Sequence, residues 1–185
     1  MGDIVELRDQ LKGLNIEIGR YTYAATMPNF NNMMCPVRIG KFCSIAPGLE
    51  FNVAGGHHLD CVSTYPFAVL DYWGECRDAL YAHHKGLAVI IGNDVWIGLN
   101  VSIMHNSPIG DGAVIGAYSV VREAVRPYAI VIGNPAREVG RRFPDEIIDK
   151  LLELRWWDWD EVKIRANMKT LTRPPDLETL EKLND

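Results

Sequence analysis

The 185-residue sequence has no apolar run that approaches the length of a membrane-spanning helix. Its first residues, MGDIVELRDQLKG, are charged and lack the apolar centre of a secretory signal, so we expect a cytoplasmic protein. Basic residues are not in excess either. The formal net charge is -5, which argues against non-specific binding to nucleic acid or to an anionic membrane. The composition therefore predicts a globular protein without a nucleic-acid or membrane partner.

The sequence also lacks paired cysteines. Its four cysteines are Cys35, Cys43, Cys61 and Cys76, and no two of them have the Cys-x-x-Cys spacing of a zinc or redox motif. We therefore expect reduced thiols, as is usual for a cytosolic protein.

One stretch of the chain carries an aliphatic residue at every sixth position. A period of six fits neither an α-helix nor a single strand, whereas a hexapeptide period is typical of a parallel β-helix. If three repeats close one triangular coil, each aliphatic residue stacks on its counterpart in the next coil and forms a dry axial column. The expected pairs are Ile91 with Ile109, Ile97 with Ile115, and Ile103 with Val121.

The same period occurs earlier, at Ile39, Ile45 and Phe51, and then breaks across residues 52–87. This excursion contains four of the five histidines, and long loops inside compact folds are often functional. Upstream, residues 3–11 have the pattern of a short amphipathic helix. Downstream, residues 128–132 should form one more strand.

After Pro144 the apolar period becomes helical, and Asp160 and Asp176 are suited to cap two further helices. An open solenoid end exposes apolar surface, so these helices are expected to cover it. We predict an all-β solenoid over residues 1–142, with an active-site loop at 52–87, followed by a C-terminal helical cap over 143–185.

The excursion begins with Gly-Gly-His-His-Leu-Asp at residues 55–60. A histidine on a Gly-Gly bend suits general-base chemistry, because imidazole exchanges a proton near neutral pH and glycine lets the backbone approach a ligand. A surface loop with two solvated histidines is the plainer interpretation, and the residues alone do not choose between the two.

Several longer motifs accompany the six-residue period. They are GGHHLDCVSTYPF, NDVWIG, IGDGAVIGAYSVV, GNPAREV and LLELRWWDW. Together they resemble the hexapeptide-repeat acyltransferases, and most of all the xenobiotic subgroup with the streptogramin acetyltransferases and one type of chloramphenicol acetyltransferase. The similarity extends over about residues 16–162. It implies a left-handed parallel β-helix, a homotrimer, and acetyl transfer from acetyl-CoA to a hydroxyl or amine of a small acceptor, with no metal required.

The resemblance also implies roles for individual residues. The family's base is a histidine three residues before an aspartate, which selects His57, with His58 as the alternate, and gives Asp60 a positioning or polarising role. The expected acetyl-CoA residues are Gly98, Leu99, Ala117, Arg122, Pro135, Arg137 and Arg142. The three arginines of this set belong to a basic cluster that also contains Arg126 and Arg141. Guanidinium groups are well suited to bind phosphate. Tyr23, Asn52 and Tyr65 are expected to bind the acceptor.

Two departures from the family pattern limit what can be carried over. Residues His105 to Pro108 stand where the family usually has Pro-Gly-Val, and the loop at 24–36 is much shorter than in the streptogramin enzymes. The acceptor therefore stays open between an antibiotic and a sugar. Direct attack on acetyl-CoA is expected, although Cys61 near the base makes a covalent route conceivable.

Two other classes of protein are compatible with parts of the sequence. A metal enzyme like the γ-type carbonic anhydrases would use three imidazoles, but the five histidines show no His-x4-His pair. A non-catalytic β-helix scaffold needs neither the histidine loop nor the arginine cluster.

Overall fold

The computed structural model describes residues 5–6, 16–29, 36–52, 57, 59–70 and 88–183. The strands of these residues form three sheets. Sheet 1 contains β2 (Ile16–Ile18), β4 (Val37–Ile39) and β7 (Val89–Ile91). Sheet 2 contains β1 (Val5–Glu6), β3 (Tyr23–Ala24), β5 (Ser44–Ile45), β8 (Trp96–Ile97), β10 (Val114–Ile115), β12 (Ala129–Ile132) and β13 (Arg137–Arg141). Sheet 3 contains β6 (Glu50–Asn52), β9 (Ser102–Met104) and β11 (Val120–Val121).

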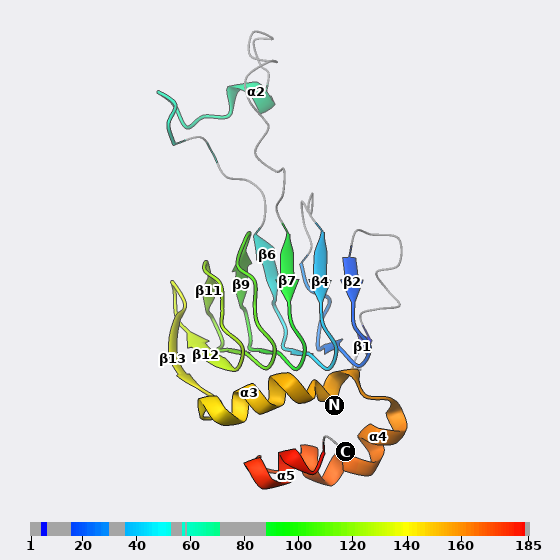
Figure 1. The fold of residues 1–185 in the computed structure, drawn as a ribbon. Helices are drawn as coiled ribbons and strands as arrows, with labels where there is room; N and C mark the ends of the chain where they lie inside the picture. Colours follow the sequence, from blue (N-terminus) through cyan, green and yellow to red (C-terminus); the bar gives the residue numbers. More distant parts are fainter. Residues whose placement is uncertain are drawn as a thin grey trace.

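The chain winds through the three sheets in a fixed order. Strands β4, β5 and β6 enter sheets 1, 2 and 3 in turn, and β7, β8 and β9 repeat the sequence one coil further on, each parallel to its counterpart. Isolated bridges from Ile91 to Ile109 and from Ile109 to Val125 continue sheet 1 into the last coils. The result is a three-sided solenoid of parallel strands with short corners (Figure 1).

The aliphatic column predicted from the six-residue period is confirmed. The register pairs Ile97 with Ile115, Ile103 with Val121, and Ile91 with Ile109. Earlier coils continue it, because Ile45 pairs with Ile97 and Phe51 with Ile103. Every side chain of the column is buried, and Ile97 and Ile103 have no exposed surface. The column is therefore the apolar core of the solenoid.

Corner 1-2, which joins sheet 1 to sheet 2, depends on residues with positive φ. Successive coils place Tyr21, Phe42, Asp94, Gly112 and Tyr128 there, with φ between 54° and 68°. At Gly112 a side chain would collide with the ring of Tyr128, since an added Cβ would lie 2.4 Å from it. This corner therefore requires glycine at that one coil while it accepts aromatic residues at others.

Polar side chains hold the same corner together from coil to coil. Asn93 Oδ1 accepts a hydrogen bond from the backbone N–H of Lys41 at 2.9 Å, and Asp111 Oδ1 accepts one from the N–H of Asn93 at 2.6 Å. One coil earlier, the Thr22 hydroxyl accepts from the N–H of Cys43 at 3.0 Å and donates to the carbonyl oxygen of Gly40 at 2.7 Å. Backbone groups that the tight turns leave unpaired are satisfied in this way.

The C-terminal helices are α3 (Asp145–Leu154), α4 (Glu161–Leu171) and α5 (Leu177–Glu181), with a 3-10 turn at Trp156–Asp158. The predicted caps are confirmed, because Asp160 accepts from the N–H of Lys163 at 2.7 Å and Asp176 from that of Thr179 at 2.8 Å.

The expected position of these helices over the open end of the solenoid is wrong. Helix α3 instead runs along corner 1-2, from the last coil back toward the first (Figure 1). The aromatic residues of the corner give it an apolar surface to cover: the rings of Phe42 and Trp156 lie 4.8 Å apart. Further along, Lys41 pairs with Asp158 at 2.9 Å and Arg20 with Glu161 at 3.0 Å.

Antiparallel strands lie at both edges of sheet 2. Strand β12 confirms the strand expected near 128–132, and β13 turns back to pair with it. At the other edge β1 pairs with β3, so Val5–Glu6 is a strand where a helix over residues 3–11 was expected; the remainder of that range lies outside the described residues. No helix within the described ranges is long and apolar enough to cross a membrane.

Replacing Ile103 by Ala should lower the free energy of unfolding by about 2–5 kcal/mol, because it opens a cavity in the column. Urea-induced unfolding at one subunit concentration measures the change. Val162→Ala is the control, since this side chain on α4 is 78% exposed, and its effect should stay within about 0.5 kcal/mol. Equal effects of the two substitutions would contradict the column as the core.

Candidate active site

His57 lies on a segment that leaves the solenoid between sheets 3 and 1. Its Nδ1 is 2.6 Å from the carbonyl oxygen of Thr64. A carbonyl oxygen only accepts hydrogen bonds, so Nδ1 carries the proton and donates it. In the neutral ring, Nε2 then keeps its lone pair and is the nitrogen that can remove a proton from another molecule. His57 is also exposed, so a substrate can reach it.

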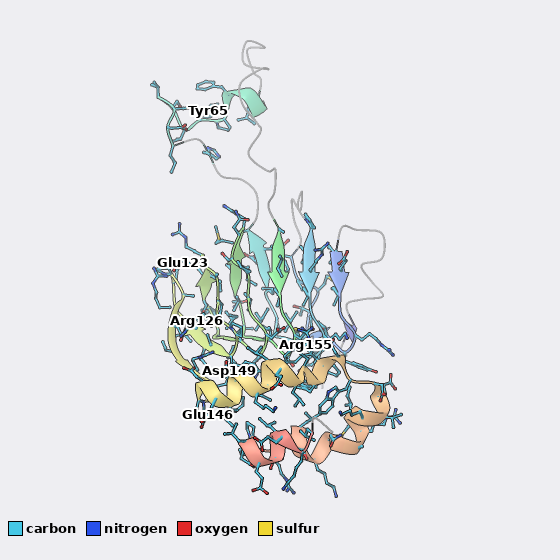
Figure 2. The ribbon with its side chains drawn as sticks, in the orientation of Figure 1. Tyr65, Glu123, Arg126, Glu146, Asp149 and Arg155 are labelled. Carbon is cyan, nitrogen blue, oxygen red and sulfur yellow. The ribbon has the colours of Figure 1, made fainter. Side chains whose placement is uncertain are left out.

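We call residue 57 and residues 59–70 the arm. It ends in the short helix α2 (Phe67–Leu70), and both Figure 1 and Figure 2 show it standing clear of the solenoid, with Tyr65 near its far end. The rings of Tyr65 and Phe67 pack together with centroids 4.7 Å apart. Apolar side chains are nevertheless open to solvent: Leu59 is 87% exposed and Val62 is fully exposed. The arm therefore has apolar surface that the described residues do not cover.

A second set of predicted residues gathers at corner 2-3, between sheets 2 and 3. Gly98 approaches the next coil so closely that an added Cβ would lie 2.7 Å from the backbone nitrogen of Ala117. The N–H of Tyr118 bonds to the carbonyl oxygen of Leu99 at 2.8 Å. The turn that contains Pro135 completes the row, because the N–H of Val120 bonds to Gly133 at 2.9 Å. The structure therefore brings Gly98, Leu99, Ala117 and Pro135 to one edge of the solenoid.

The predicted arginines separate into two kinds. Arg137 is more than half exposed and pairs with the exposed Glu123 at 3.3 Å. Exposed pairs of this type contribute little and exchange readily, so Arg137 is available to a ligand. Arg122 is also exposed, and its side chain has no ion pair among the described residues. Arg137 begins β13 beside the turn that contains Pro135, whereas Arg122 follows β11 and lies past sheet 3, next to Glu123 in the chain.

Arg142 was expected to bind the cofactor, but its contacts give it a structural role. Its Nη1 lies 2.8 Å from Asp94 and 2.9 Å from the carbonyl oxygen of Gly112. The guanidinium also packs 5.2 Å from the ring centres of both Tyr128 and Phe143. Two further members of the basic cluster are engaged as well: Arg126 pairs with Glu138, and Arg141 pairs with Asp145. These three arginines of the basic cluster are therefore paired with carboxylates, which leaves fewer guanidinium groups to bind phosphate than the sequence suggested.

The remaining predicted site residues do not meet in the structure. Tyr23 lies in sheet 2, Asn52 ends strand β6 of sheet 3, and Tyr65 is on the arm. The arm follows the strands of sheet 3, whereas corner 2-3 precedes them, so His57 and the row at that corner lie on different edges. The alternate base His58 lies outside the described residues, as do 53–56 and 71–87 of the predicted loop. Asp60 is described and exposed.

Comparison with known proteins decides the family. Residues 88–123 match the bacterial transferase hexapeptide family of six repeats. A chloramphenicol acetyltransferase of Klebsiella aerogenes is 42% identical over 180 residues, which cover 89% of this chain and 86% of that protein. The chain belongs to the hexapeptide-repeat acetyltransferases. It is therefore an acetyltransferase, and the resemblance drawn from its motifs is confirmed.

Other members of the family share parts of the chain. A probable macrolide acetyltransferase of Lysinibacillus sphaericus is 44% identical over 77% of this chain and 80% of its own length. Among solved structures, the maltose O-acetyltransferase of Clostridium difficile 630 is 29% identical with a TM-score of 0.53. That match covers 71% of this chain, which spans only 62% of the solved protein.

The cysteines and the metal alternative can be examined in the described residues. Burial raises the pKa of Cys43 to about 11, so its thiol stays protonated and unreactive at neutral pH. Cys61, by contrast, is exposed on the arm. No group of three or more His, Cys, Asp or Glu residues in the described ranges is arranged to hold a metal ion. His83 and His84, which the metal alternative invoked, fall outside those ranges.

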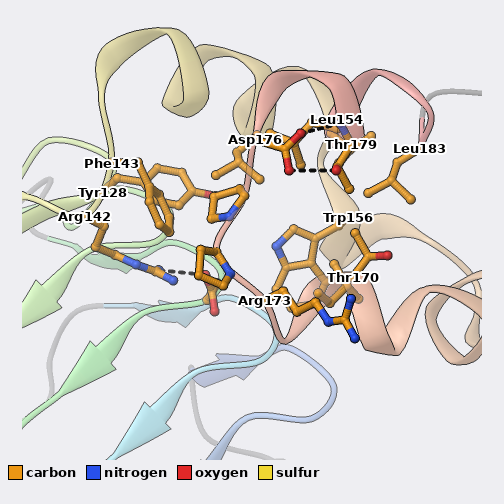
Figure 3. Close-up of a pocket in the computed structure, with 16 residues that line it drawn as sticks. Tyr128, Arg142, Phe143, Leu154, Trp156, Thr170, Arg173, Asp176, Thr179 and Leu183 are labelled. Carbon is orange, nitrogen blue, oxygen red and sulfur yellow. Dashed lines mark hydrogen bonds and ion pairs between the residues drawn. The ribbon is translucent and has the colours of Figure 1, made fainter.

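One feature that sequence reasoning missed is a cavity of about 260 Å³ between corner 1-2 and the C-terminal helices. Figure 3 shows Tyr128, Phe143 and Trp156 around it, with Arg142 at one side. Asp94, which pairs with Arg142, also lines the cavity. Burial raises the pKa of Asp94, although the adjacent Arg142 opposes that shift. No motif signals this pair, because its members are far apart in sequence and belong to different structural units.

Replacing Arg142 by Ala should destabilise the protein by about 2–3 kcal/mol at neutral pH, between the values for exposed and buried pairs. The loss leaves the Asp94 carboxylate without its partner. Because the folded-state pKa of Asp94 is already raised, its ionised form opposes folding; this penalty shrinks as the pH falls through that pKa and is gone only below the ordinary pKa of an unfolded-state carboxyl group. The deficit, measured by chemical denaturation, should therefore shrink on acidification.

Two variants provide the controls. Asp94→Asn added to Arg142→Ala should recover part of the loss at neutral pH, because no buried charge remains. Arg126→Ala removes an arginine that is 63% exposed and paired with Glu138, and should cost no more than about 1 kcal/mol. If Arg142→Ala is no more harmful than Arg126→Ala at any pH, the structural role of Arg142 is refuted.

Proposed function

We propose that this chain transfers the acetyl group of acetyl-CoA to a hydroxyl of a small antibiotic, with chloramphenicol as the first candidate. The observation that carries the proposal is the 42% identity, over most of both chains, to the chloramphenicol acetyltransferase of Klebsiella aerogenes. The relatives from Lysinibacillus sphaericus and, for virginiamycin A, from Staphylococcus aureus also bear the names of antibiotic acetyltransferases. We retain the cytoplasmic location expected from the sequence.

His57 is the general base of the proposed reaction. Its Nε2 takes the proton of the acceptor hydroxyl as that oxygen attacks the thioester carbonyl carbon of acetyl-CoA. The tetrahedral oxyanion is held by a backbone N–H of the solenoid edge, and the thiolate of CoA then leaves and receives the proton. The hydrogen bond from Nδ1 to Thr64 fixes the tautomer that this step needs. Asp60, three residues on, supports the position of the base.

The donor site is corner 2-3. The row of Gly98, Leu99, Ala117 and Pro135 offers backbone and apolar side chains to the slender pantetheine arm, and Gly98 leaves the backbone open to close approach. Arg137, exposed beside this row, and Arg122, exposed past the end of sheet 3, are the phosphate ligands. Arg142 is left out of the donor site because its guanidinium is already bonded to Asp94 and Gly112.

The site is completed by assembly. We propose a homotrimer of left-handed β-helices in which the arm of one subunit brings His57 to the donor groove of the next. Two observations support this arrangement: His57 and the row at corner 2-3 lie on different edges of the solenoid, and the arm exposes Leu59 and Val62. Tyr23, Asn52 and Tyr65, which are scattered in one subunit, would meet the acceptor at the same junction.

A sugar hydroxyl is the alternative acceptor. It is favoured by the similarity to the solved maltose O-acetyltransferase, which is 29% identical. The short loop at residues 24–36 does not decide between the two. Release of CoA thiol in the presence of chloramphenicol, virginiamycin A, a macrolide and maltose compares them directly. Transfer to maltose alone would overturn the antibiotic as acceptor.

Replacing His57 by Ala should lower kcat by about 10²–10⁴-fold with little change in the KM for acetyl-CoA, the usual effect of losing a general base. Cys61→Ala is the matched control on the same arm and should stay within about tenfold of the parent, because it has no chemical step. An inactive Cys61→Ala variant together with a burst of acetyl-enzyme would show covalent transfer instead. Full loss in His58→Ala with an active His57→Ala would move the base by one residue.

Subunits carrying His57→Ala and subunits carrying Arg137→Ala should restore each other's activity in mixed trimers. With differently tagged chains, roughly one site in three of every purified mixed trimer has both an intact base and an intact groove. The assay is acetyl transfer at low acetyl-CoA, where each parent variant is nearly inactive. Mixed trimers without recovered activity would place the whole site in one subunit, and light scattering checks the trimer itself.

A further inference from the structure

Tyr118 adopts a backbone conformation that tyrosine seldom uses. Its φ is 60°, in the left-handed region, which costs most residues about 1 kcal/mol. The equivalent positions one and two coils earlier at corner 2-3 are Asn100, with φ of 51°, and Gly48, with φ of 78°. Glycine and asparagine enter this region readily, so they meet the need of the corner without strain. Tyrosine at this coil requires another explanation.

Corner 1-2 shows how aromatic residues in this conformation are stabilised elsewhere in the protein. Tyr21 stacks on Phe42 with centroids 4.8 Å apart, and Phe42 packs against Trp156 at the same distance. Tyr128 lies 5.9 Å from the ring of Phe143. Each of these rings lies under the C-terminal segment, and the packing offsets the strained turn. Aromatic residues at this kind of corner are therefore associated with something that covers them.

Tyr118 has no such cover. Its side chain is 64% exposed, and in the part of the chain that the structure describes its ring has no aromatic, cationic or hydrogen-bonded partner. The C-terminal helices follow the other corner and do not supply one (Figure 1). A strained, exposed aromatic ring without an intramolecular partner is a candidate contact for a ligand.

The position of Tyr118 indicates which ligand. It follows Ala117 directly, and its N–H bonds to Leu99, so it lies within the row assigned to the donor. The next residues bond to the turn after β12: Ser119 accepts from the N–H of Gly133 at 3.1 Å, and Val120 donates to its carbonyl oxygen. Tyr118 is thus at the end of the row nearest to Pro135, close in the fold to the turn that leads into Arg137.

We propose that the ring of Tyr118 stacks on the adenine of acetyl-CoA. The inference rests on the proposed function and assigns one part of the donor to one side chain. Adenine is the only flat aromatic part of acetyl-CoA, whereas the pantetheine arm offers no ring to stack. The phosphates that the two arginines would hold lie next to the adenine in the molecule. The turn fixes the backbone of Tyr118 and the direction of its Cα–Cβ bond before binding, so only the side-chain torsions are ordered when the base stacks.

The test compares two donors in two variants. Tyr118→Asn removes the ring while keeping a residue that tolerates positive φ, and Tyr118→Phe keeps the ring. With acetyl-CoA, Tyr118→Asn should raise KM about 3- to 10-fold with kcat little changed, as expected for one stacked ring pair. With acetyl-pantetheine, which lacks the nucleotide, Tyr118→Asn should match the parent. Tyr118→Phe should stay within about twofold of the parent with both donors.

Other outcomes overturn the inference. An equal rise in KM with both donors would place the ring on pantetheine, and a rise only in the KM for the acceptor would place it there. A fall in kcat together with a lower unfolding midpoint would make Tyr118 structural. Titration calorimetry with CoA separates the two levels of the argument. If the parent does not bind CoA, the proposed function itself fails; if parent and Tyr118→Asn bind CoA equally, only the stacking fails.

Discussion

Parallel pairing between successive coils is the interaction on which this structure depends. Its strands are two to five residues long, too short to be stable alone, and each is held by the coil before and the coil after it. The aliphatic column enforces the register of this pairing, because a slip of one residue would turn Ile97 and Ile103 outward. The tight corners, with their positive φ angles and their Asn93 and Asp111 side chains, follow from the same need to bring strands of equal length back into alignment.

The candidate site uses two products of that architecture. Corner 2-3 is an edge where successive coils approach closely, since any side chain at Gly98 would collide with the coil above. The arm is the opposite case, a long insertion between two strands that the solenoid tolerates because β6 and β7 belong to different sheets. A rigid edge suits the binding of an extended cofactor, and a separate arm suits the delivery of a base. Variation in the arm and in the loop at 24–36 can therefore occur without disturbing this edge of the solenoid.

The sequence predicts those parts of the fold that repeat or that rest on local chemistry. The six-residue period predicts each stacked pair of the column. Asp160 and Asp176 predict the starts of their helices, because an N-cap side chain bonds to a backbone N–H only two or three residues further on. The position of α3 could not be predicted, since an apolar helix face shows that it will be buried but not against what. The same limit applies to Arg142. Its guanidinium group is suited to phosphate, and only the fold shows that this group is already paired with Asp94. For His57, the family spacing to Asp60 predicts which histidine is the base. The tautomer of its ring can be inferred only from the distance between Nδ1 and the carbonyl oxygen of Thr64 in the structure.

The path of the C-terminal helices has a consequence for how the molecule comes apart. In a simple solenoid each repeat touches only its neighbours, so the array behaves like a one-dimensional chain that frays from either end. Here Phe143 packs on Tyr128 in the last coil, Trp156 on Phe42 and Glu161 against Arg20 and Tyr21 in the first coils. The segment acts as a strap that joins the two termini of the stack. Opening either end then also breaks contacts at the other, which converts a set of nearly independent repeats into one cooperative unit.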